Sequence, residues 1–303
     1  MSLLFQGSLE LGIIYAIMAL GVFISFRTLN MPDLTVDSSF TLGAAVSAVL
    51  CFNGQPILAL AVAFAAGCIA GSATALLTTK LKIQPLLSGI LIMLALYSIN
   101  LKVMGNKANI PLLNKPTLFS PFKDTAMENS IRLLLSTGIL AVVLILLFYF
   151  LKTRFGLVLR ATGDNDKMVR ALGVDTDFTT LIGLALSNGL VALSGALIAQ
   201  YQSFADVSMG IGMVVIGLAS VIIGEVIFGT KSLLRRLVAV ILGAVLYRFI
   251  IALALRLGMP PTDLKLISAI IVALALSMGV IRDKVVSLNG RQATMGKEKG
   301  GRK

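Results

Sequence analysis

Histidine and cysteine, the residues that most often hold metals or act as nucleophiles, are almost missing from this 303-residue chain. It has no histidine and two cysteines, Cys51 and Cys68. Cys51 lies near the end of one apolar run and Cys68 near the middle of the next. A helical rise of about 1.5 Å per residue places them at different depths. We therefore expect no metal site, no cofactor and no disulfide.

One segment nearly matches a phosphate-binding loop. Residues 224–232 read Gly-Glu-Val-Ile-Phe-Gly-Thr-Lys-Ser, but Thr230 separates the second glycine from the lysine. The motif also needs a preceding β-strand, whereas an apolar run of helical length precedes this segment. We therefore expect that the chain binds no ATP, is not an enzyme, and takes its energy from a partner.

Several polar residues lie inside apolar runs, where each is costly in hydrocarbon and usually faces a bundle interior or a water path. They are Asp37, Asn100, Asn188, Glu225 and Arg248. Glu225 is expected to meet Arg235 or Arg236, because Arg248 lies at a different depth in the next run. For Arg248, lining a pathway and clamping helix-end carbonyls both remain open.

A translocation path through such a chain needs few charges. We expect a central passage of small and apolar side chains from runs 35–52, 85–104 and 178–201. Its expected polar members are Ser88, Asn100, Ser187 and Asn188. Hydrogen bonding between helices is the alternative role for the two asparagines.

The elements that must position these residues are membrane-spanning helices. The chain is 57% hydrophobic and 13% charged, about half the charge of a soluble domain. Apolar runs of near-spanning length occupy 8–26, 35–52, 57–79, 85–104, 131–151, 178–201, 209–228, 237–256 and 264–281. This predicts an all-α polytopic transmembrane bundle of about nine spans, within a range of eight to ten. Run 35–52 begins with polar residues and is the candidate for a broken or re-entrant helix.

Lysine and arginine set the expected orientation. With the N-terminus outside and the C-terminus inside, inner segments hold 18 basic residues and outer segments 7, as the positive-inside rule requires. This predicts a membrane domain over 1–281, an extracytoplasmic loop at 105–130 and a cytoplasmic loop at 152–177. Residues 282–303 are expected to form a basic, disordered cytoplasmic tail. The net charge of +12 is scattered between apolar runs, which argues against nucleic-acid binding.

The loop 152–177 carries the signals of a short helix. Asp164 is a good N-cap and Gly173 a good left-handed stop, which predicts a helix over 165–172. Met168 and Leu172 are four residues apart and share a face, as docking into a partner's groove requires. Candidate docking residues are Gly163, Asp164, Asp166, Met168, Arg170, Leu172 and Gly173. A helix lying on the membrane surface is the alternative.

Residues 156–174, Gly-Leu-Val-Leu-Arg-Ala-Thr-Gly-Asp-Asn-Asp-Lys-Met-Val-Arg-Ala-Leu-Gly-Val, resemble the cytoplasmic coupling loop of permeases in branched-chain amino acid and simple-sugar ABC importers. Residues 15–44, 89–111 and 219–229 resemble a branch of that superfamily in which some members are linked to aromatic amino acids. The resemblance implies a bacterial-type inner-membrane importer with two permease copies, two cytoplasmic ATP-binding subunits and an extracytoplasmic substrate-binding protein. Segment 27–37 is more acidic than in the better-known amino acid permeases, so their substrate does not transfer.

Two other classes remain alternatives. A secondary transporter without an ATPase would show paired inverted repeats, broken helices and midplane acidic residues. Asp37 is at most one such residue, and it is expected nearer the inner face. A channel-like or scaffolding subunit fits the composition but leaves the capped inner-loop helix unexplained. ATP-dependent uptake that requires a partner ATPase separates the first class from both.

Overall fold

The computed structural model describes residues 2–122, 128–260, 263, 266–270 and 273. Its long helices are α1 (Ser2–Val22), α2 (Thr35–Phe52), α3 (Pro56–Thr79), α4 (Pro85–Val103), α5 (Glu128–Lys152), α8 (Thr176–Gln202), α9 (Met213–Phe228) and α10 (Leu233–Arg256). The shorter elements are a π-helical segment (Phe23–Thr28), α6 (Arg154–Asp164), α7 (Asp166–Ala171), a 3-10 turn (Ser120–Phe122), and strands β1 (Asn109–Pro111) and β2 (Phe204–Asp206).

Seven of these helices are long and apolar enough to cross a membrane: α1 with the π-helical segment, α2, α3, α4, α5, α8 and α10. The all-α polytopic architecture expected from the sequence is therefore confirmed. Run 35–52 forms one unbroken helix, so a break within it, one of the two expected forms, was wrong; a re-entrant helix stays a prediction. Most of the run 264–281 and the whole tail 282–303 lie outside the described residues.

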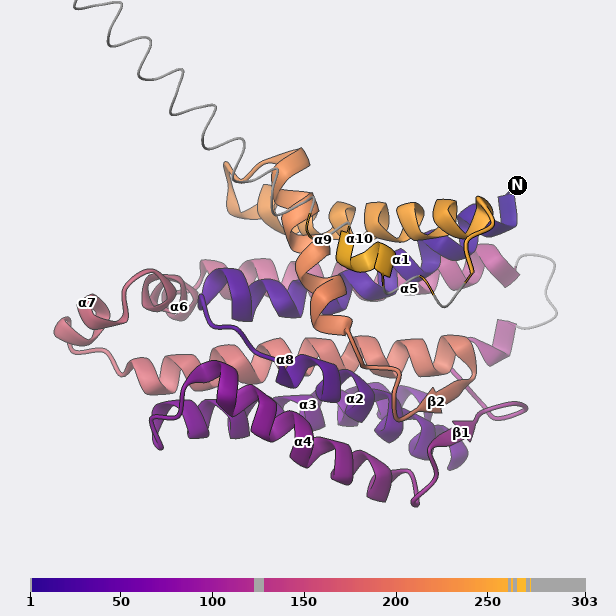
Figure 1. The fold of residues 1–303 in the computed structure, drawn as a ribbon, viewed down its shortest axis with the longest axis horizontal. Coiled ribbons are helices and arrows are strands. Elements are labelled where there is room, and N and C mark those ends of the chain that lie inside the picture. The colour runs from indigo at the N-terminus through magenta and orange to yellow at the C-terminus, as the bar shows by residue number, and fades with distance from the viewer. Residues whose placement is uncertain (1, 123–127, 261–262, 264–265, 271–272, 274–303) are drawn as a thin grey trace, which may run out of the picture.

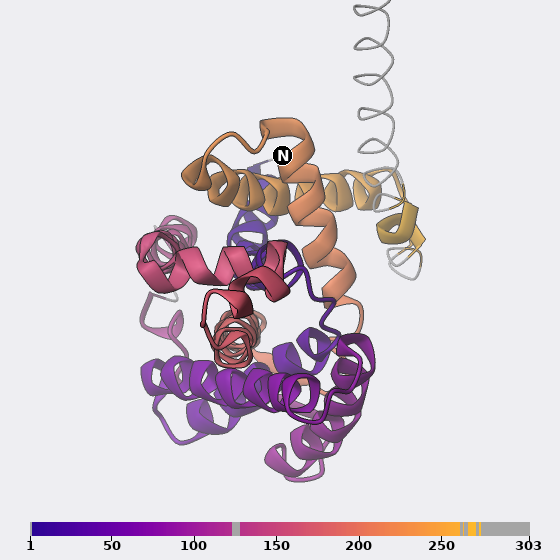
Figure 2. The same cartoon turned by 90° about the vertical axis from the view of Figure 1, so that its left-hand side faces the viewer.

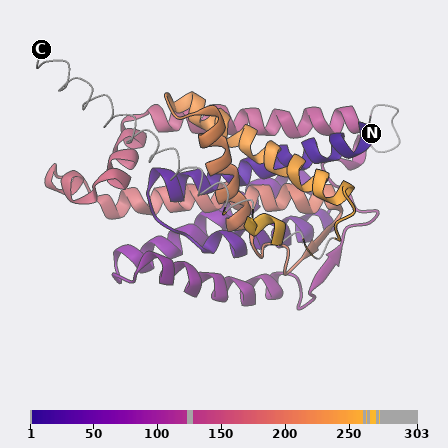
Figure 3. The same cartoon turned by 45° about the horizontal axis from the view of Figure 1, so that its top comes forward.

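Run 209–228 yields a shorter helix than predicted. α9 begins only at Met213 and has 16 residues. Gly210 packs against α2, where an added Cβ would lie 1.9 Å from the Asp37 carbonyl oxygen. Gly212 then takes a left-handed φ of +89°, which favours glycine. These two glycines turn the chain before α9 can start, and α9 crosses the long helices obliquely (Figures 1 and 3).

The interior of the bundle is built around α8. Figure 2, which looks along the bundle, shows α8 between α1 on one side and α2 to α4 on the other. In the most apolar stretch of each helix, the share of residues that are buried is 83% for α1 and 72% for α2 and α8. It is only 22% for α4 and α5. The exposed apolar side chains of α4 and α5 suit contact with lipid, whereas α1, α2 and α8 form the protein core.

Small residues allow the close helix contacts. An added Cβ at Gly43 of α2 would lie 1.9 Å from the Ala192 carbonyl oxygen of α8. At Gly71 of α3 it would lie 2.1 Å from the Leu184 carbonyl oxygen of α8. Backbones that approach this closely leave no room for a side chain, which is how small residues drive helix packing in membranes.

Two helix N-termini lie partway along α8. Asn188, twelve residues after the start of α8, contacts Asp33 just before α2, which places the start of α2 about 18 Å along α8. α9 begins beside Asp37, one turn further along α2. At the two extremities of the bundle lie α7 and the antiparallel β1–β2 pair, here called the α7 end and the hairpin end (Figure 1).

Candidate functional site

The segment between α5 and α8 folds as two short helices at the α7 end. α6 was not expected from the sequence. Thr153 caps it, since the Gly156 backbone N–H donates to Thr153 Oγ1 at 3.1 Å. An added Cβ at Gly156 would lie 2.4 Å from the Phe150 carbonyl oxygen. Gly156 therefore permits the tight turn that folds α6 back against the end of α5.

The α7 segment, residues 163–173, contains the predicted helix with a different cap. Asp164 is the last residue of α6, and Asn165 caps α7 by accepting from the Met168 backbone N–H at 3.1 Å. The expectation that Asp164 is the N-cap was therefore wrong. Gly173 ends the helix with φ +83°, so the predicted left-handed stop is confirmed.

The two faces of α7 differ sharply. Val169 is 2% exposed and anchors the helix on the bundle. Met168 is 53% exposed and Leu172 74%, so the pair expected to share a face projects away from the protein. An apolar pair held outward on a capped helix is a suitable element for insertion into a groove on another protein.

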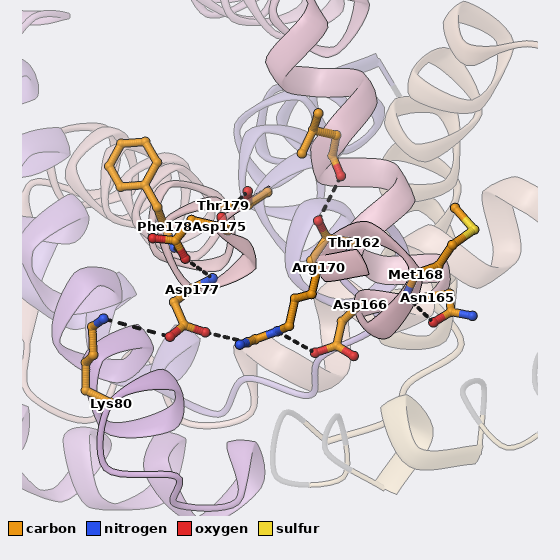
Figure 4. Close-up of polar contacts among 11 residues, drawn as sticks. Lys80, Thr162, Asn165, Asp166, Met168, Arg170, Asp175, Asp177, Phe178 and Thr179 are labelled. Atoms are coloured by element: carbon orange, nitrogen blue, oxygen red, sulfur yellow. Dashed lines mark hydrogen bonds and ion pairs between the residues drawn. The ribbon is translucent and has the colours of Figure 1, made fainter. Parts of the chain in front are cut away.

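Salt bridges hold α7 against the membrane helices (Figure 4). Arg170 bridges Asp166, at 3.5 Å, and Asp177 in the first turn of α8. Asp177 also contacts Lys80 Nζ after α3, at 3.8 Å. The Asp177 carboxylate raises the pKa of Arg170 by accepting its hydrogen bond. The series of ion pairs Lys80–Asp177–Arg170–Asp166 thus links the end of α3, the start of α8 and α7.

A second contact joins the α7 segment to α1. An added Cβ at Gly163 would lie 1.9 Å from the Thr28 carbonyl oxygen, at the end of the π-helical segment. Arg27 in the same segment bridges Glu225 of α9 at 3.0 Å, and Arg236 lies 3.6 Å from that carboxylate. Of the two expected partners of Glu225, Arg236 is therefore observed. Arg235 instead donates to the Phe228 carbonyl oxygen.

Polar residues predicted to line a passage along α8 contact neighbouring helices. The Ser187 hydroxyl donates to the Gly21 carbonyl oxygen of α1 at 2.7 Å. Asn188 Nδ2 donates to the carboxylate of Asp33 at 2.7 Å. Asp33 also accepts from the Thr35 backbone N–H at 2.9 Å, and so caps α2 from within the bundle. These side chains are buried between helices.

Asp37 joins α2 to α9. Its two carboxylate oxygens accept from the backbone N–H groups of Gly212 at 2.9 Å and Val214 at 2.8 Å. A carboxylate at a helix N-terminus satisfies orphan donors and interacts favourably with the helix dipole. Asp37 therefore acts as the N-terminal cap of a helix distant in sequence.

The remaining predicted polar residues also have defined contacts. Asn100 Nδ2 donates to the Ser38 carbonyl oxygen at 3.1 Å, which joins α4 to α2. Ser88 donates to the Ile83 carbonyl oxygen just before its own helix. The Arg248 guanidinium carbon lies 3.8 Å from the ring centre of Tyr15 on α1, a cation–π contact. Among the described residues, Arg248 Nε has no hydrogen-bond partner, so no contact of this atom with a helix-end carbonyl is observed there.

Sequence reasoning missed Arg27, Asp33, Asn165 and Asp177. Asn165 carries a local signal, because asparagine caps helices as well as aspartate does. The other three act through partners far along the chain or in another helix, for which a single sequence has no signal. Within the described part of the chain, no group of three or more Cys, Asp or Glu residues is arranged to hold a metal ion.

Comparison with known proteins gives consistent matches over most of the chain. The family model described as the permease component of the branched-chain amino acid transport system matches residues 4–276. A tyrosine transport system permease protein of Clostridioides difficile (strain R20291) is 42% identical over 280 residues, covering 92% of each chain. No solved structure matches the chain.

More distant relatives are named for an amino acid and for a sugar. The probable branched-chain amino acid transport permease protein LivH of Methanocaldococcus jannaschii is 26% identical over 244 residues, covering 73% of this chain and 74% of LivH. The ribose import permease protein RbsC of Escherichia coli (strain K12) is 25% identical over 265 residues, covering 86% and 80%.

Proposed function

Because the chain belongs to the family of permease components of branched-chain amino acid transport systems, we propose that it is the membrane-spanning subunit of an ATP-driven amino acid importer. It is a multi-pass membrane protein of the bacterial inner-membrane type. Its role is to provide the path, while ATP hydrolysis takes place on a separate chain.

The α7 segment is the observation that carries this proposal. It projects Met168 and Leu172 outward while Val169 and the Arg170–Asp177 bridge fix its position. A helix that only lay on the membrane would need a longer apolar face than two exposed residues provide. Docking into the groove of an ATP-binding subunit explains both the exposed pair and the rigid attachment.

The proposed assembly has two copies of this chain, two ATP-binding subunits beneath the α7 ends, and a substrate-binding protein at the hairpin ends. The excess of basic residues near the α7 end supports placing that end in the cytoplasm. Closure of the ATP-binding subunits would then move α7. The Lys80–Asp177–Arg170 series of ion pairs and the Gly163–Thr28 contact offer two routes by which this motion reaches the membrane helices.

An amino acid is the proposed solute. The relative that covers 92% of this chain is named a tyrosine permease, and a more distant one a branched-chain amino acid permease. A solute delivered by a binding protein needs only a weak, transient path. We propose that this path passes mainly small and apolar side chains of α2, α4 and α8, near Ser88, Asn100, Ser187 and Asn188.

One feature is shared with secondary transporters, in which broken helices place N-termini and acidic residues near the midplane. α2 and α9 both start partway along the bundle, beside Asp33 and Asp37. Both carboxylates, however, already accept hydrogen bonds from backbone amides or Asn188. This favours a structural role over ion coupling.

Reconstitution tests the proposal. The permease is placed in proteoliposomes with and without a candidate ATP-binding subunit, and uptake of radiolabelled tyrosine and leucine is measured with a candidate binding protein present. We expect uptake that needs ATP and the ATP-binding subunit and is insensitive to Na⁺ or H⁺ gradients. Uptake driven by an ion gradient without that subunit would instead establish a secondary transporter.

A further inference from the structure

A single carboxylate lies between two arginines where the end of α1 meets α9 and α10. Glu225, in the last turn of α9, has a side chain that is 11% exposed. Arg27 Nε of the π-helical segment donates to Glu225 Oε1 at 3.1 Å and lies 3.0 Å from Oε2. Arg236 Nε, in the first turn of α10, lies 3.6 Å from Oε1. One acid thus faces two cations that belong to different segments.

The two arginines hold this carboxylate unequally. Arg27 is hydrogen-bonded to it, whereas 3.6 Å is too long for a hydrogen bond from Arg236. Arg236 Nε is buried and has no hydrogen-bond partner among the described residues. The neighbouring Arg235 instead donates to the Phe228 carbonyl oxygen at 2.6 Å. Arg236 is therefore an unused second partner, since an approach of about 0.6 Å would complete its hydrogen bond.

α9 and α10, which carry Glu225 and its second partner, are packed too closely to separate easily. An added Cβ at Gly224 of α9 would lie 2.1 Å from the Ala239 carbonyl oxygen of α10. One at Gly243 of α10 would lie 2.1 Å from the Ser220 carbonyl oxygen of α9. Backbones in such contact move together. The carboxylate and the arginine of α10 therefore stay neighbours even if the arginine of the π-helical segment moves away.

The segment that carries Arg27 has a wider turn than an α-helix. The Leu29 backbone N–H donates to the Ile24 carbonyl oxygen, five residues back, at 2.9 Å. The Met31 N–H donates to the Ser25 carbonyl oxygen, six residues back, also at 2.9 Å. An α-helix pairs residues that are four apart. Such wide turns are rare and are frequently found at functional sites.

The two ends of this wide turn are attached to different parts of the molecule. Just before it, Val22 packs on α9, where an added Cβ at Gly217 would lie 2.7 Å from Val22 Cγ2. At its end, the Thr28 carbonyl oxygen packs on Gly163 of the α7 segment. A displacement of the α7 segment therefore acts on the end of the wide turn while its beginning is held by α9.

We propose that residues 23–28 form a two-state switch whose states differ in the partner of Glu225. In the arrangement described, the turn is wide and Arg27 holds the carboxylate. Return to an α-helical turn takes one residue out of it, which rotates Arg27 by about 100° and away from Glu225. Arg236 then takes over the carboxylate. The charge is paired in both states, which keeps the cost of the exchange low. The inference rests on the proposed function in one respect: its trigger is the motion of the α7 segment.

Thermal unfolding of the full-length permease in lipid nanodiscs tests the exchange. Arg27→Gln and Arg236→Gln should each lower the unfolding midpoint only slightly, because the remaining arginine pairs with Glu225. The double variant leaves the carboxylate without a cation, so its midpoint should fall by more than the sum of the two single shifts. Arg27→Gln with Arg235→Gln is the matched control and should be additive. Additive shifts in both pairs would overturn the exchange.

A fluorescent reporter tests whether the segment has two states. The chain contains no tryptophan, so Phe26→Trp, within the switch, gives a signal from this segment alone. In this background Arg27→Gln should shift the emission maximum, whereas Arg236→Gln should not, since it leaves the described state in place. Tyr149→Trp on α5 is the control reporter and should respond to neither. Unchanged emission of the Phe26→Trp reporter on Arg27→Gln would mean that the wide turn is a fixed element and would refute the switch.

Both measurements need neither ATP nor a partner subunit, so they separate the switch from the proposed function. With a candidate ATP-binding subunit present, ATP should shift the Phe26→Trp emission as Arg27→Gln does. A response to Arg27→Gln without a response to ATP would refute the α7 segment as the trigger. ATP-dependent uptake by a permease whose arginine substitutions are additive and whose reporter is silent would refute the switch and leave the importer standing.

Discussion

Asp37 connects two helices that are 175 residues apart in the sequence. Its carboxylate accepts hydrogen bonds from the backbone N–H groups of Gly212 and Val214. Among the described residues, no other side chain caps the start of α9. Val214 is buried and Gly212 is partly buried. A single acidic side chain therefore determines where α9 can begin and how it is held against α2.

Replacing Asp37 should destabilise the protein in proportion to the acceptors lost. Asp37→Leu leaves both amides without their acceptor, at a cost of about 1–3 kcal/mol for each buried group. Asp37→Asn keeps one oxygen and should cost less. The measurement is thermal unfolding in detergent. The extent of unfolding is read from the labelling of Cys51, which is buried in the native state. Asp166→Asn, at an exposed position, serves as the control and should shift the transition little.

At the scale of elements, the coupling proposal depends on the shape of α7. Gly173→Val forces a β-branched residue to φ +83°, a strained conformation, and should misplace the helix. Met168→Asp puts a charge into the proposed groove, where it would be buried without a partner. Both variants should insert and purify normally, but lose stimulation of the partner ATPase and lose uptake.

A glycine at the hairpin end provides the matched control. Gly105 also has a positive φ, +67°, with no neighbouring atom within 4 Å of an added Cβ. Gly105→Val imposes the same kind of backbone strain far from α7 and should leave ATPase stimulation intact. Normal uptake by both α7 variants would mean that the segment is only a surface helix.

Helix packing makes a separate prediction about α2 and α8. Gly43→Ala should destabilise the bundle by about 1–3 kcal/mol, because its methyl group would lie 1.9 Å from the Ala192 carbonyl oxygen. Gly138 of α5 has no neighbour within 4 Å, so Gly138→Ala should be neutral or stabilising. The fraction of monodisperse protein after heating, measured by size-exclusion chromatography, compares the two. Equal heat resistance would show that α2 and α8 can separate without loss.

At the scale of the whole molecule, the proposed topology has the hairpin end outside and the α7 end inside. Single cysteines at positions 115, 165 and 295 are introduced after Cys51 and Cys68 are replaced by alanine. An impermeant maleimide added to intact cells should label position 115, and label 165 and 295 only after the membrane is opened. Labelling of position 165 from outside would overturn the orientation and the docking proposal with it.

The sequence by itself determined the features that depend on local chemistry. Apolar runs of near-spanning length predict helices because hydrocarbon tolerates no unsatisfied backbone. The left-handed stop at Gly173 and the shared face of Met168 and Leu172 follow from backbone sterics and helical spacing. These features need no knowledge of the rest of the fold. Seven of the nine runs form helices long enough to cross a membrane, and the stop at Gly173 and the outward pair Met168 and Leu172 are observed.

Only the tertiary structure decided which distant groups meet. Arg27 and Glu225 are 198 residues apart, and Asn188 and Asp33 are 155 apart. The packing of Gly163 on Thr28 accompanies the extension of α6 to Asp164 and leaves the cap of α7 to Asn165. Run 209–228 is apolar enough for a longer helix, yet Gly210 and Gly212 turn against α2 before α9 begins. The energies of such contacts depend on distances between elements, and a single sequence does not contain those distances.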